Sequence, residues 1–438
     1  MLRGRLMMPG YRTGDLAARA IARSLFRRLA GGQLTVIEGQ RRERFGQPGE
    51  LEATLHVMHP ALWRTALAGG GVGFAEAYMR GLWDSDDVVV VLRVLARNLD
   101  RINRLLRNPL TRIRTASHVL DRLHAPTPDD DRRNIQAHYD LGDDFFKLFL
   151  DPTMAYSCAL FERPDMSLEQ ASTAKFERLC RQLGITSDSH IIEIGTGWGG
   201  FAVHAARQYG CRVTTTTISD QQYAYAQDLV RREELQGKVE VLREHYRDLQ
   251  GTYTHLVSVE MIEAVDWRLY DEFFATIQRL LRPDGLAAIQ AIVVDDREFE
   301  RSKHWKDFIK RYIFPGGCLP SIAAMLDTTK RVTDLSLVDL HDIGRHYATT
   351  LRHWRSALDS RIDEARAMGL TERFLRMWRY YFAYCEAGFA ERRISDVQMV
   401  FARPGWRPPQ VAHAPAGVRA ETGSSSHAPT SLYKSRLS

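Results

Sequence analysis

The sequence predicts an α/β protein with a doubly wound, mostly parallel sheet and a smaller domain at its N-terminal end. Strands and helices alternate between residues 190 and 294, and alternation of this kind gives a parallel sheet with helices on both faces. A run of β-forming residues also ends in the turn Gly195-x-Gly197-x-Gly199. The length of 438 residues leaves room for a second domain.

Residues 1–30 are predicted to form a basic amphipathic segment, which contains seven arginines and a single acid, Asp15. Apolar residues recur at helical spacing, at Leu16, Ala20, Ile21, Leu25, Phe26 and Leu29. Such a helix can lie on an anionic membrane, or it can pack on the domain and expose its arginines to solvent. Local sequence leaves both alternatives open.

The N-terminal domain is predicted to span residues 31–124. Alternating apolar and polar residues over 33–58 indicate short strands with a turn at Gly46–Gly49, and helical periodicity from Pro60 to Leu123 is interrupted at 68–74. The polar stretch 125–134 is a predicted linker, residues 135–405 form the main domain, and the Pro- and Ser-rich segment 406–438 is expected to be disordered.

The main domain shows its strands and helices in alternating order. The predicted strands span 190–195, 211–218, 238–244, 255–260 and 286–294. The predicted helices span 201–210, 221–235 and 270–285, the last stopping at a Pro-Asp-Gly turn.

The glycine turn follows the first of these strands and opens a helix, which places backbone N–H groups beside a bound cofactor. The spacing is not the G-x-G-x-x-G of dinucleotide enzymes, and no acid follows the second strand at the ribose position. No Gly-Lys-Ser/Thr follows either, so a phosphate-binding P-loop is excluded. Glu263 follows an apolar strand at the carboxyl edge of the sheet, where doubly wound folds bind ligands.

The composition narrows the class of protein further. Five cysteines are scattered without a C-x-x-C spacing, so neither a disulfide framework nor a metal site is expected. No apolar run is long enough to cross a bilayer, and no signal peptide begins the chain, so a cytoplasmic location is expected. No nucleic-acid partner is expected.

Several motifs together resemble the cyclopropane-fatty-acyl-phospholipid synthases and their mycolic-acid relatives, which are S-adenosylmethionine-dependent methyltransferases. They occur in the family's order over about residues 60–403, as "HYDLGDDFFKLFLDPTMAYSCALF", "EIGTGWGG", "TISDQQ", "VEMIEAV", "YIFPGGCLPS" and "HYATTL". The resemblance implies a Rossmann-like methyltransferase sheet with helical acyl-pocket insertions, a lipid-associated N-terminal domain and S-adenosylmethionine as cofactor. The implied acceptor is an unsaturated phospholipid acyl chain on the inner face of an anionic membrane, and a homodimer is left open.

The resemblance also assigns roles to residues. Cofactor contacts fall on Tyr156, Ser157, Gly195, Gly197, Thr217, Ile218 and Gln222. The family's base, a bicarbonate ion, would be held by Cys158, Glu263, the Ile292 backbone and Tyr347, with Gln290 at a position that is histidine in the best-known synthases. The aromatic residues expected to line the substrate pocket are Tyr139, Phe145, Phe146, Tyr312 and Phe314.

Three departures from the family's pattern concern the product. Gln290 and Ala264 replace two histidines, and Glu260 stands where many members have glycine. A cyclopropane is the expected product, while a methylene- or methyl-branched chain of the tuberculostearic type is the alternative. A small-amine N-methyltransferase and a non-enzymatic lipid-binding protein are further alternatives. A lipid acceptor also requires a channel from the exterior to the space between Glu263 and Tyr347.

Overall fold

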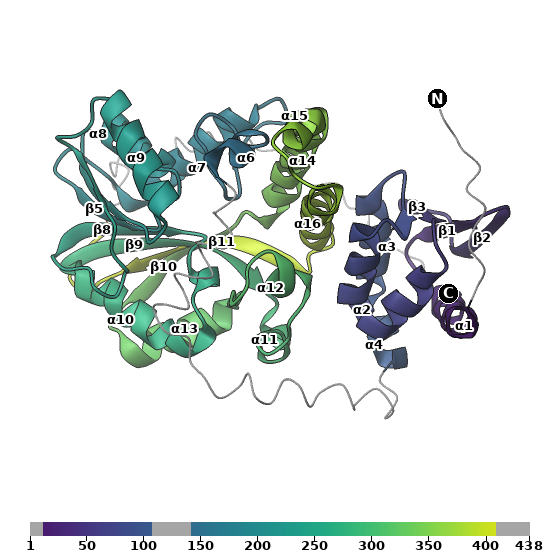
Figure 1. The fold of residues 1–438 in the computed structure, drawn as a ribbon. Helices are drawn as coiled ribbons and strands as arrows, with labels where there is room; N and C mark the ends of the chain where they lie inside the picture. Colours follow the sequence, from purple (N-terminus) through teal and green to yellow (C-terminus); the bar gives the residue numbers. More distant parts are fainter. Residues whose placement is uncertain (1–11, 107–141, 409–438) are drawn as a thin grey trace, which may run out of the picture. The chain divides into compact units, whose positions relative to one another are not determined.

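The computed structural model describes residues 12–106 and 142–408 (Figure 1). The described residues up to Trp406 belong to one compact unit. The predicted linker, Tyr139 and nearly all of the predicted tail lie outside the described residues. Within the described ranges, no helix is both long and apolar enough to span a bilayer.

The main sheet has seven strands in the order β10-β11-β9-β8-β5-β6-β7. The strands are β5 (His190–Ile194), β6 (Arg212–Thr216), β7 (Val239–Leu242), β8 (Tyr253–Val259), β9 (Leu281–Val294), β10 (Ser336–Asp342) and β11 (Ile394–Ala402). Strands β5 to β9 pair in parallel, whereas β11 runs antiparallel to both β9 and β10. The doubly wound, mostly parallel sheet is therefore confirmed, with one reversed strand, β11, and a further strand, β10, that the sequence did not reveal.

Helices cover both faces of this sheet (Figure 1). One face packs against α7 (Leu168–Leu183), α8 (Gly200–Tyr209) and α9 (Asp220–Arg232). The other face packs against α10 (Tyr270–Leu280) and α13 (Ile322–Val332). The helix predicted to reach residue 285 ends at Leu280, because Pro283 cannot donate a helical hydrogen bond.

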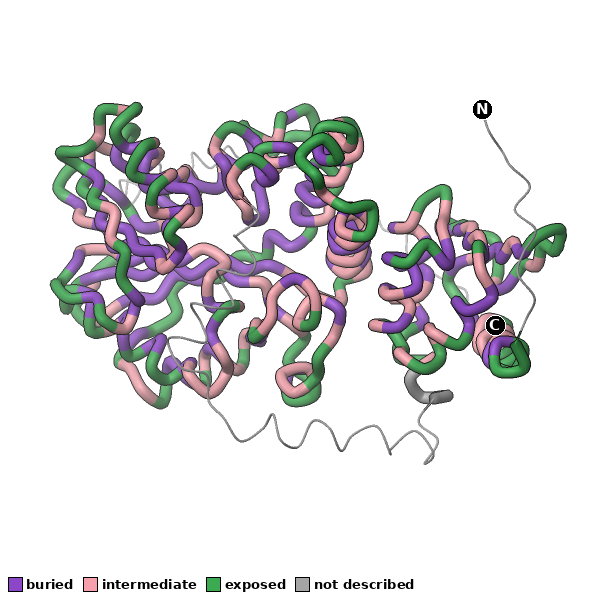
Figure 2. Tube along the Cα trace, viewed as in Figure 1, coloured by how far each residue is buried: buried purple, intermediate pink, exposed green. Residues whose placement is uncertain are grey.

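A further group of helices lies beside the sheet and encloses an aromatic core. These helices are α6 (Asp143–Lys147), α12 (Phe308–Tyr312), α14 (Gly344–Ser360), α15 (Ile362–Ala367) and α16 (Glu372–Ala390), whereas α11 (Asp296–Ser302) packs with α10 and α13 through Phe299. Two single turns, η3 (Ile262–Ala264) and η4 (Trp267–Leu269), follow β8. Buried residues run from the sheet into α14 and α16 (Figure 2).

The N-terminal part contains a smaller sheet in the order β2-β1-β3-β4. Its elements are α1 (Thr13–Phe26), β1 (Gln33–Glu38), β2 (Arg41–Gly46), β3 (Glu52–Val57), α2 (Ala61–Met79), β4 (Trp83–Asp84), α3 (Val88–Arg97) and α4 (Leu99–Leu106). The predicted interruption of the second helix is confirmed, since Gly70 has a φ of 58° inside α2. Gly39, with a φ of 60°, forms an additional turn between β1 and β2.

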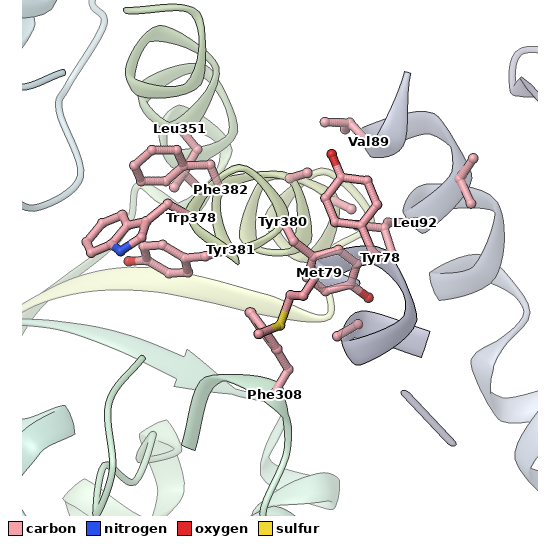
Figure 3. Packing of buried hydrophobic residues seen from close by; sticks show 14 of the residues in the cluster. Tyr78, Met79, Val89, Leu92, Phe308, Leu351, Trp378, Tyr380, Tyr381 and Phe382 are labelled. Carbon is pink, nitrogen blue, oxygen red and sulfur yellow. The ribbon is translucent and has the colours of Figure 1, made fainter. Parts of the chain in front are cut away.

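The N-terminal elements share a hydrophobic core with α16. Tyr78 and Met79 of α2 pack with Tyr380 and Phe308 (Figure 3). Arg376 of α16 donates hydrogen bonds to the backbone oxygens of Tyr78 and Trp83, at 2.6 and 3.0 Å. The smaller sheet is therefore tied to the helices beside the main sheet.

Candidate active site

Glu260 directly follows β8, at the carboxyl edge of the main sheet, and has a φ of 48°. Its backbone N–H donates to the backbone carbonyl oxygen of Gln290 in β9 at 2.8 Å. This left-handed conformation favours glycine, and a larger residue there carries strain on the order of 1–2 kcal/mol. Strain of this kind is concentrated at functional sites, so the Glu260 side chain is a candidate for function.

Three hydrogen-bond donors converge on the Glu260 carboxylate. The Cys158 backbone N–H donates to Oε1 at 2.7 Å, and the Gln290 side-chain amide donates to the same atom at 2.8 Å. The Tyr347 hydroxyl of α14 donates to Oε2 at 2.6 Å. Burial, followed by the charge of Glu260, raises the pKa of Tyr347 well above its ordinary value, so its phenol remains a donor.

The amide of Gln290 is oriented by strand β11. Antiparallel pairing places Gln398 opposite Gln290, and its side-chain N–H donates to Gln290 Oε1 at 3.0 Å. Gln290 Nε2 then donates both to Glu260 and to Asp396 Oδ2, the latter at 2.9 Å. Burial first, and the charge of Glu260 second, raise the pKa of Asp396 well above its ordinary value.

Glu263 lies in η3, one turn beyond Glu260. Its Oε1 accepts the Ile292 backbone N–H at 2.5 Å. Part of the Glu263 residue remains accessible, but its Oε2 is buried and has no hydrogen-bond partner in the described part of the chain. Burial first, and the Glu260 charge second, raise the pKa of Glu263 to about 8.

Two further polar groups lie behind this cluster. Burial raises the pKa of the Cys158 thiol, which contacts the Ile343 carbonyl at 3.7 Å, so Cys158 is an inert thiol and not a nucleophile. Lys175 of α7 is fully buried and its Nζ donates to Ser157 Oγ at 2.5 Å. Burial lowers the pKa of Lys175, while the charges of Glu260, Cys158 and Asp396 act in the opposite direction.

The predicted glycine turn joins β5 to α8. Gly195, Gly197 and Gly199 have φ values of 99°, 52° and 91°. A Cβ at Gly195 would lie 3.1 Å from the Met261 side chain, and one at Gly199 would lie 3.3 Å from Ala226, whereas one at Gly197 would meet open space. Gly197 therefore leaves the room beside the backbone that a bound S-adenosylmethionine requires.

Several of the other predicted cofactor residues have hydrogen-bond partners within the protein. Thr217 donates to the Gln222 side-chain oxygen at 2.8 Å, and the neighbouring Ile218 is partly exposed. Tyr156 shares a hydrogen bond of 2.9 Å with Tyr381. The side chains that would hold the cofactor are thus already fixed by partners in the protein.

The residues predicted to line the acyl pocket have other neighbours. Phe145 and Phe146 are fully buried among aromatic rings that include Trp378, and Phe314 contacts Tyr381. The Tyr312 hydroxyl donates to Glu76 of α2 at 2.6 Å. Their role in the substrate pocket stays a prediction.

The required acyl channel also stays a prediction. One cavity of about 10 Å³ lies between α1 and the smaller sheet, and a pocket of about 440 Å³ lies at the end of α13. Neither cavity is lined by Glu260 or by the residues that donate hydrogen bonds to it, Cys158, Gln290 and Tyr347.

Sequence reasoning named five of the residues around this site but not its centre. It noted Glu260 only as a departure, and it missed Asp396, Gln398 and Lys175. A signal for two of them was present, because Asp396 and Gln398 are polar residues spaced by two in an otherwise apolar strand. The unusual burial of Lys175 on α7 had no local signal.

Known proteins share sequence and fold with this chain. The chain is 38% identical to a tuberculostearic acid methyltransferase of Mycobacterium tuberculosis, over 90% of this chain and 93% of that protein. It is 34% identical to a cyclopropane-fatty-acyl-phospholipid synthase of Escherichia coli, over 81% of this chain and 89% of that protein. A solved mycolic acid cyclopropane synthase in complex with S-adenosylhomocysteine (SAH) matches 62% of this chain and 98% of its own, with a TM-score of 0.59 and 32% identity.

The family model of mycolic acid cyclopropane synthetase matches residues 127–399, which include the glycine turn, Glu263 and Tyr347. The chain belongs to this family of S-adenosylmethionine-dependent methyltransferases.

Proposed function

We propose that the chain methylates the double bond of unsaturated phospholipid acyl chains and that Glu260 accepts the proton released in the reaction. The convergence of three donors on the Glu260 carboxylate carries this proposal. The similarity to enzymes named for cyclopropane fatty-acyl phospholipids and for tuberculostearic acid supports the acceptor.

The bound sulfonium cofactor supplies an electrophilic methyl group. The π electrons of the acyl double bond form the new carbon–carbon bond as the methyl–sulfur bond breaks, which leaves a positive charge on the acyl chain. Loss of a proton then gives a neutral product. The protein must hold a base within hydrogen-bonding reach of that proton and exclude water from the cation.

The Glu260 carboxylate fits the role of this base better than a free bicarbonate ion. Cys158 and Tyr347 occupy two positions that the resemblance associates with bicarbonate, and both donate to Glu260, as does Gln290. The fourth donor, the Ile292 N–H, is taken by Glu263. A tethered carboxylate therefore replaces the ion and is held in place without a separate binding step.

The surrounding groups orient this carboxylate. Burial raises the pKa of both Asp396 and Glu263, which favours the uncharged form of each beside Glu260. The phenol of Tyr347 fixes Oε2, and the pair of Gln290 and Gln398 fixes Oε1 from the opposite side. Gln290 cannot itself carry the proton, as a histidine could.

A cyclopropane and a branched chain both arise from the same methylated cation. Removal of a proton from the added methyl closes the ring, whereas a hydride shift before proton loss gives a methylene group that a separate reduction converts to a methyl branch. The cyclopropane is the expected product, and the 38% identity to a tuberculostearic acid methyltransferase keeps the branched chain as the alternative.

Lipid analysis tests the function directly. We expect a host without its own cyclopropane synthase to gain acyl chains one CH₂ heavier when it expresses the chain, as measured by mass spectrometry. Proton NMR of the fatty esters then separates the two products, because ring protons resonate upfield. Unchanged lipids in a host rich in unsaturated chains would refute the proposal.

A Glu263→Gln variant in the same host separates cofactor binding from turnover. It preserves the acceptor for the Ile292 N–H, so it should bind SAH like the wild type in calorimetry while product falls. A small-amine methyltransferase would leave the lipids of this host unchanged and would have no reason to bind vesicles. We propose peripheral association with an anionic membrane as the means of reaching the acyl chain; a homodimer stays a prediction.

A further inference from the structure

Helix α1 packs on the N-terminal sheet with its charged side. Arg19 Nε lies 2.5 Å from Glu38 Oε2, and Arg23 forms an ion pair with Glu43. Asp15 at the start of the helix is buried and lies 3.3 Å from Arg64 of α2. The arginines that were expected to face solvent or membrane are therefore used, in part, to hold the helix to the domain.

The apolar residues of α1 lie on two sides of the helix. Ala18 is buried, and the Phe26 ring packs against Phe45 and Trp63. On the other side, Leu16 is 51% exposed, Ile21 is 44% exposed, and Ala17 and Ala20 are exposed as well. Spacings of three and four residues place these four side chains together, so the helix presents an apolar surface in addition to the one that it buries.

The fold also separates the charges of residues 12–46. The three acids of this segment, Asp15, Glu38 and Glu43, all turn inward and are paired with arginines. Every exposed charged residue of the segment is an arginine, namely Arg12, Arg27, Arg28, Arg41, Arg42 and Arg44. None of these six forms an ion pair with another residue that the structure describes. The surface is therefore more basic than the composition of the segment indicates.

These observations define an α1 face, which consists of the exposed Leu16, Ala17, Ala20 and Ile21 together with the flanking Arg12, Arg27, Arg28 and Arg41. We propose that the α1 face docks on an anionic phospholipid bilayer. The arginines match the headgroup charge, and the apolar side chains can enter the boundary between headgroups and acyl chains. The inference rests on the proposed function, since the acyl chains to be methylated belong to such a bilayer.

The proposal combines the two alternatives that the sequence left open for the first helix. The helix packs on the domain through Arg19 and Arg23, and it keeps an apolar face for a membrane on the other side. Arg42 and Arg44 lie on the edge strand β2, on the opposite side of the strand from Glu43 and Phe45, and add positive charge nearby.

Co-sedimentation of the full chain with vesicles tests the α1 face. The wild type should pellet with vesicles of phosphatidylglycerol and phosphatidylcholine, and much less with phosphatidylcholine alone or at high salt. A Leu16→Glu/Ile21→Glu variant should bind about tenfold more weakly. Arg27→Gln/Arg28→Gln should weaken binding about fivefold for each arginine removed.

A matched control introduces the same charges at another exposed apolar site. Val338 and Leu340 of β10 are 44% and 38% exposed, so a Val338→Glu/Leu340→Glu variant should bind vesicles like the wild type. Equal binding by the α1 variants, or equal loss in the control, would overturn the proposal. A wild type that ignores vesicles but forms a dimer lost in the α1 variant would assign the face to a second copy of the chain and overturn it as well.

A second readout separates this inference from the proposed function. The Leu16→Glu/Ile21→Glu variant should lose methyl transfer to vesicles but keep it on the same lipid dispersed in neutral detergent micelles. Loss of activity in micelles as well would show that the two substitutions impair the enzyme itself and not only its docking on the bilayer, and it would contradict the inference. Absence of methyl transfer by the wild type in both media, with vesicle binding intact, would contradict the proposed function alone.

Discussion

At Glu260, a backbone conformation that favours glycine carries a carboxylate instead, and three donors from three separate segments meet on it. The strain of the left-handed residue is offset by these charge-assisted hydrogen bonds, which are stronger than neutral ones. The sequence alone identified Glu260 as unusual, because it stands at a glycine position. Its contact with Tyr347 could not be predicted, since 87 residues separate the two.

Buried carboxyls around the site make stability depend on pH. Burial raises the pKa of Glu193 in β5 to about 8, from a usual value near 4.5. Between these values the folded chain keeps a proton that the unfolded chain has lost, so this group's contribution to stability falls as pH rises. We expect Glu193→Gln to flatten that slope and to stabilise the protein at pH 8 by on the order of a few kcal/mol.

Melting temperatures of the wild type and Glu193→Gln, measured from pH 5 to pH 8.5, check this expectation. The two curves should diverge as pH rises, while the exposed Glu169→Gln should run parallel to the wild type. Parallel curves for all three proteins would show that Glu193 is not protonated in the folded state.

At the scale of elements, the glycine turn and Glu260 both lie at the carboxyl edge of the sheet, where β5 and β8 end. The glycine turn, the parallel strands and their helices follow from local patterns, and the structure confirms them. Strands β10 and β11 did not follow, because each pairs with a strand distant in sequence and β10 is exposed along its whole length. Asp396 and Gln398 were missed with them.

The turn offers a sharp test, because glycines with positive φ stand at both ends of α8. Gly197→Val should abolish binding of SAH, since the new side chain would fill the open space beside the turn. Gly210→Val carries comparable backbone strain at the far end, where φ is 67° and a Cβ has only a distant contact. We expect Gly210→Val to lower the melting temperature while calorimetry shows unchanged affinity. Retained affinity in Gly197→Val would show that the cofactor lies elsewhere.

At the scale of the whole molecule, the smaller sheet and the helices beside the main sheet are joined by one core. Arg376 is central to this junction, since it caps two backbone oxygens, pairs with Asp84 and lies over the Tyr78 ring at 4.0 Å. The sequence predicted two domains but not this shared core. Aromatic residues such as Tyr380 show no local sign of which distant segment they will contact.

Replacement of Arg376 tests how far the two parts unfold together. Arg376→Met leaves two buried carbonyls without a donor, so it should destabilise the chain by about 3 kcal/mol. Calorimetry should show one transition at a lower temperature, while Arg373→Met, an exposed site on the same helix, should match the wild type. Two separate transitions in the wild type would contradict a single cooperative core.

The assignment of Glu260 as the base is tested most directly by turnover in buffer depleted of carbon dioxide, with and without added bicarbonate. Wild-type turnover should be the same in both conditions. Glu260→Gly should be inactive without bicarbonate and regain activity as the ion is added, because the glycine opens the space between Cys158, Gln290 and Tyr347. A wild type that loses turnover when bicarbonate is removed would contradict the account.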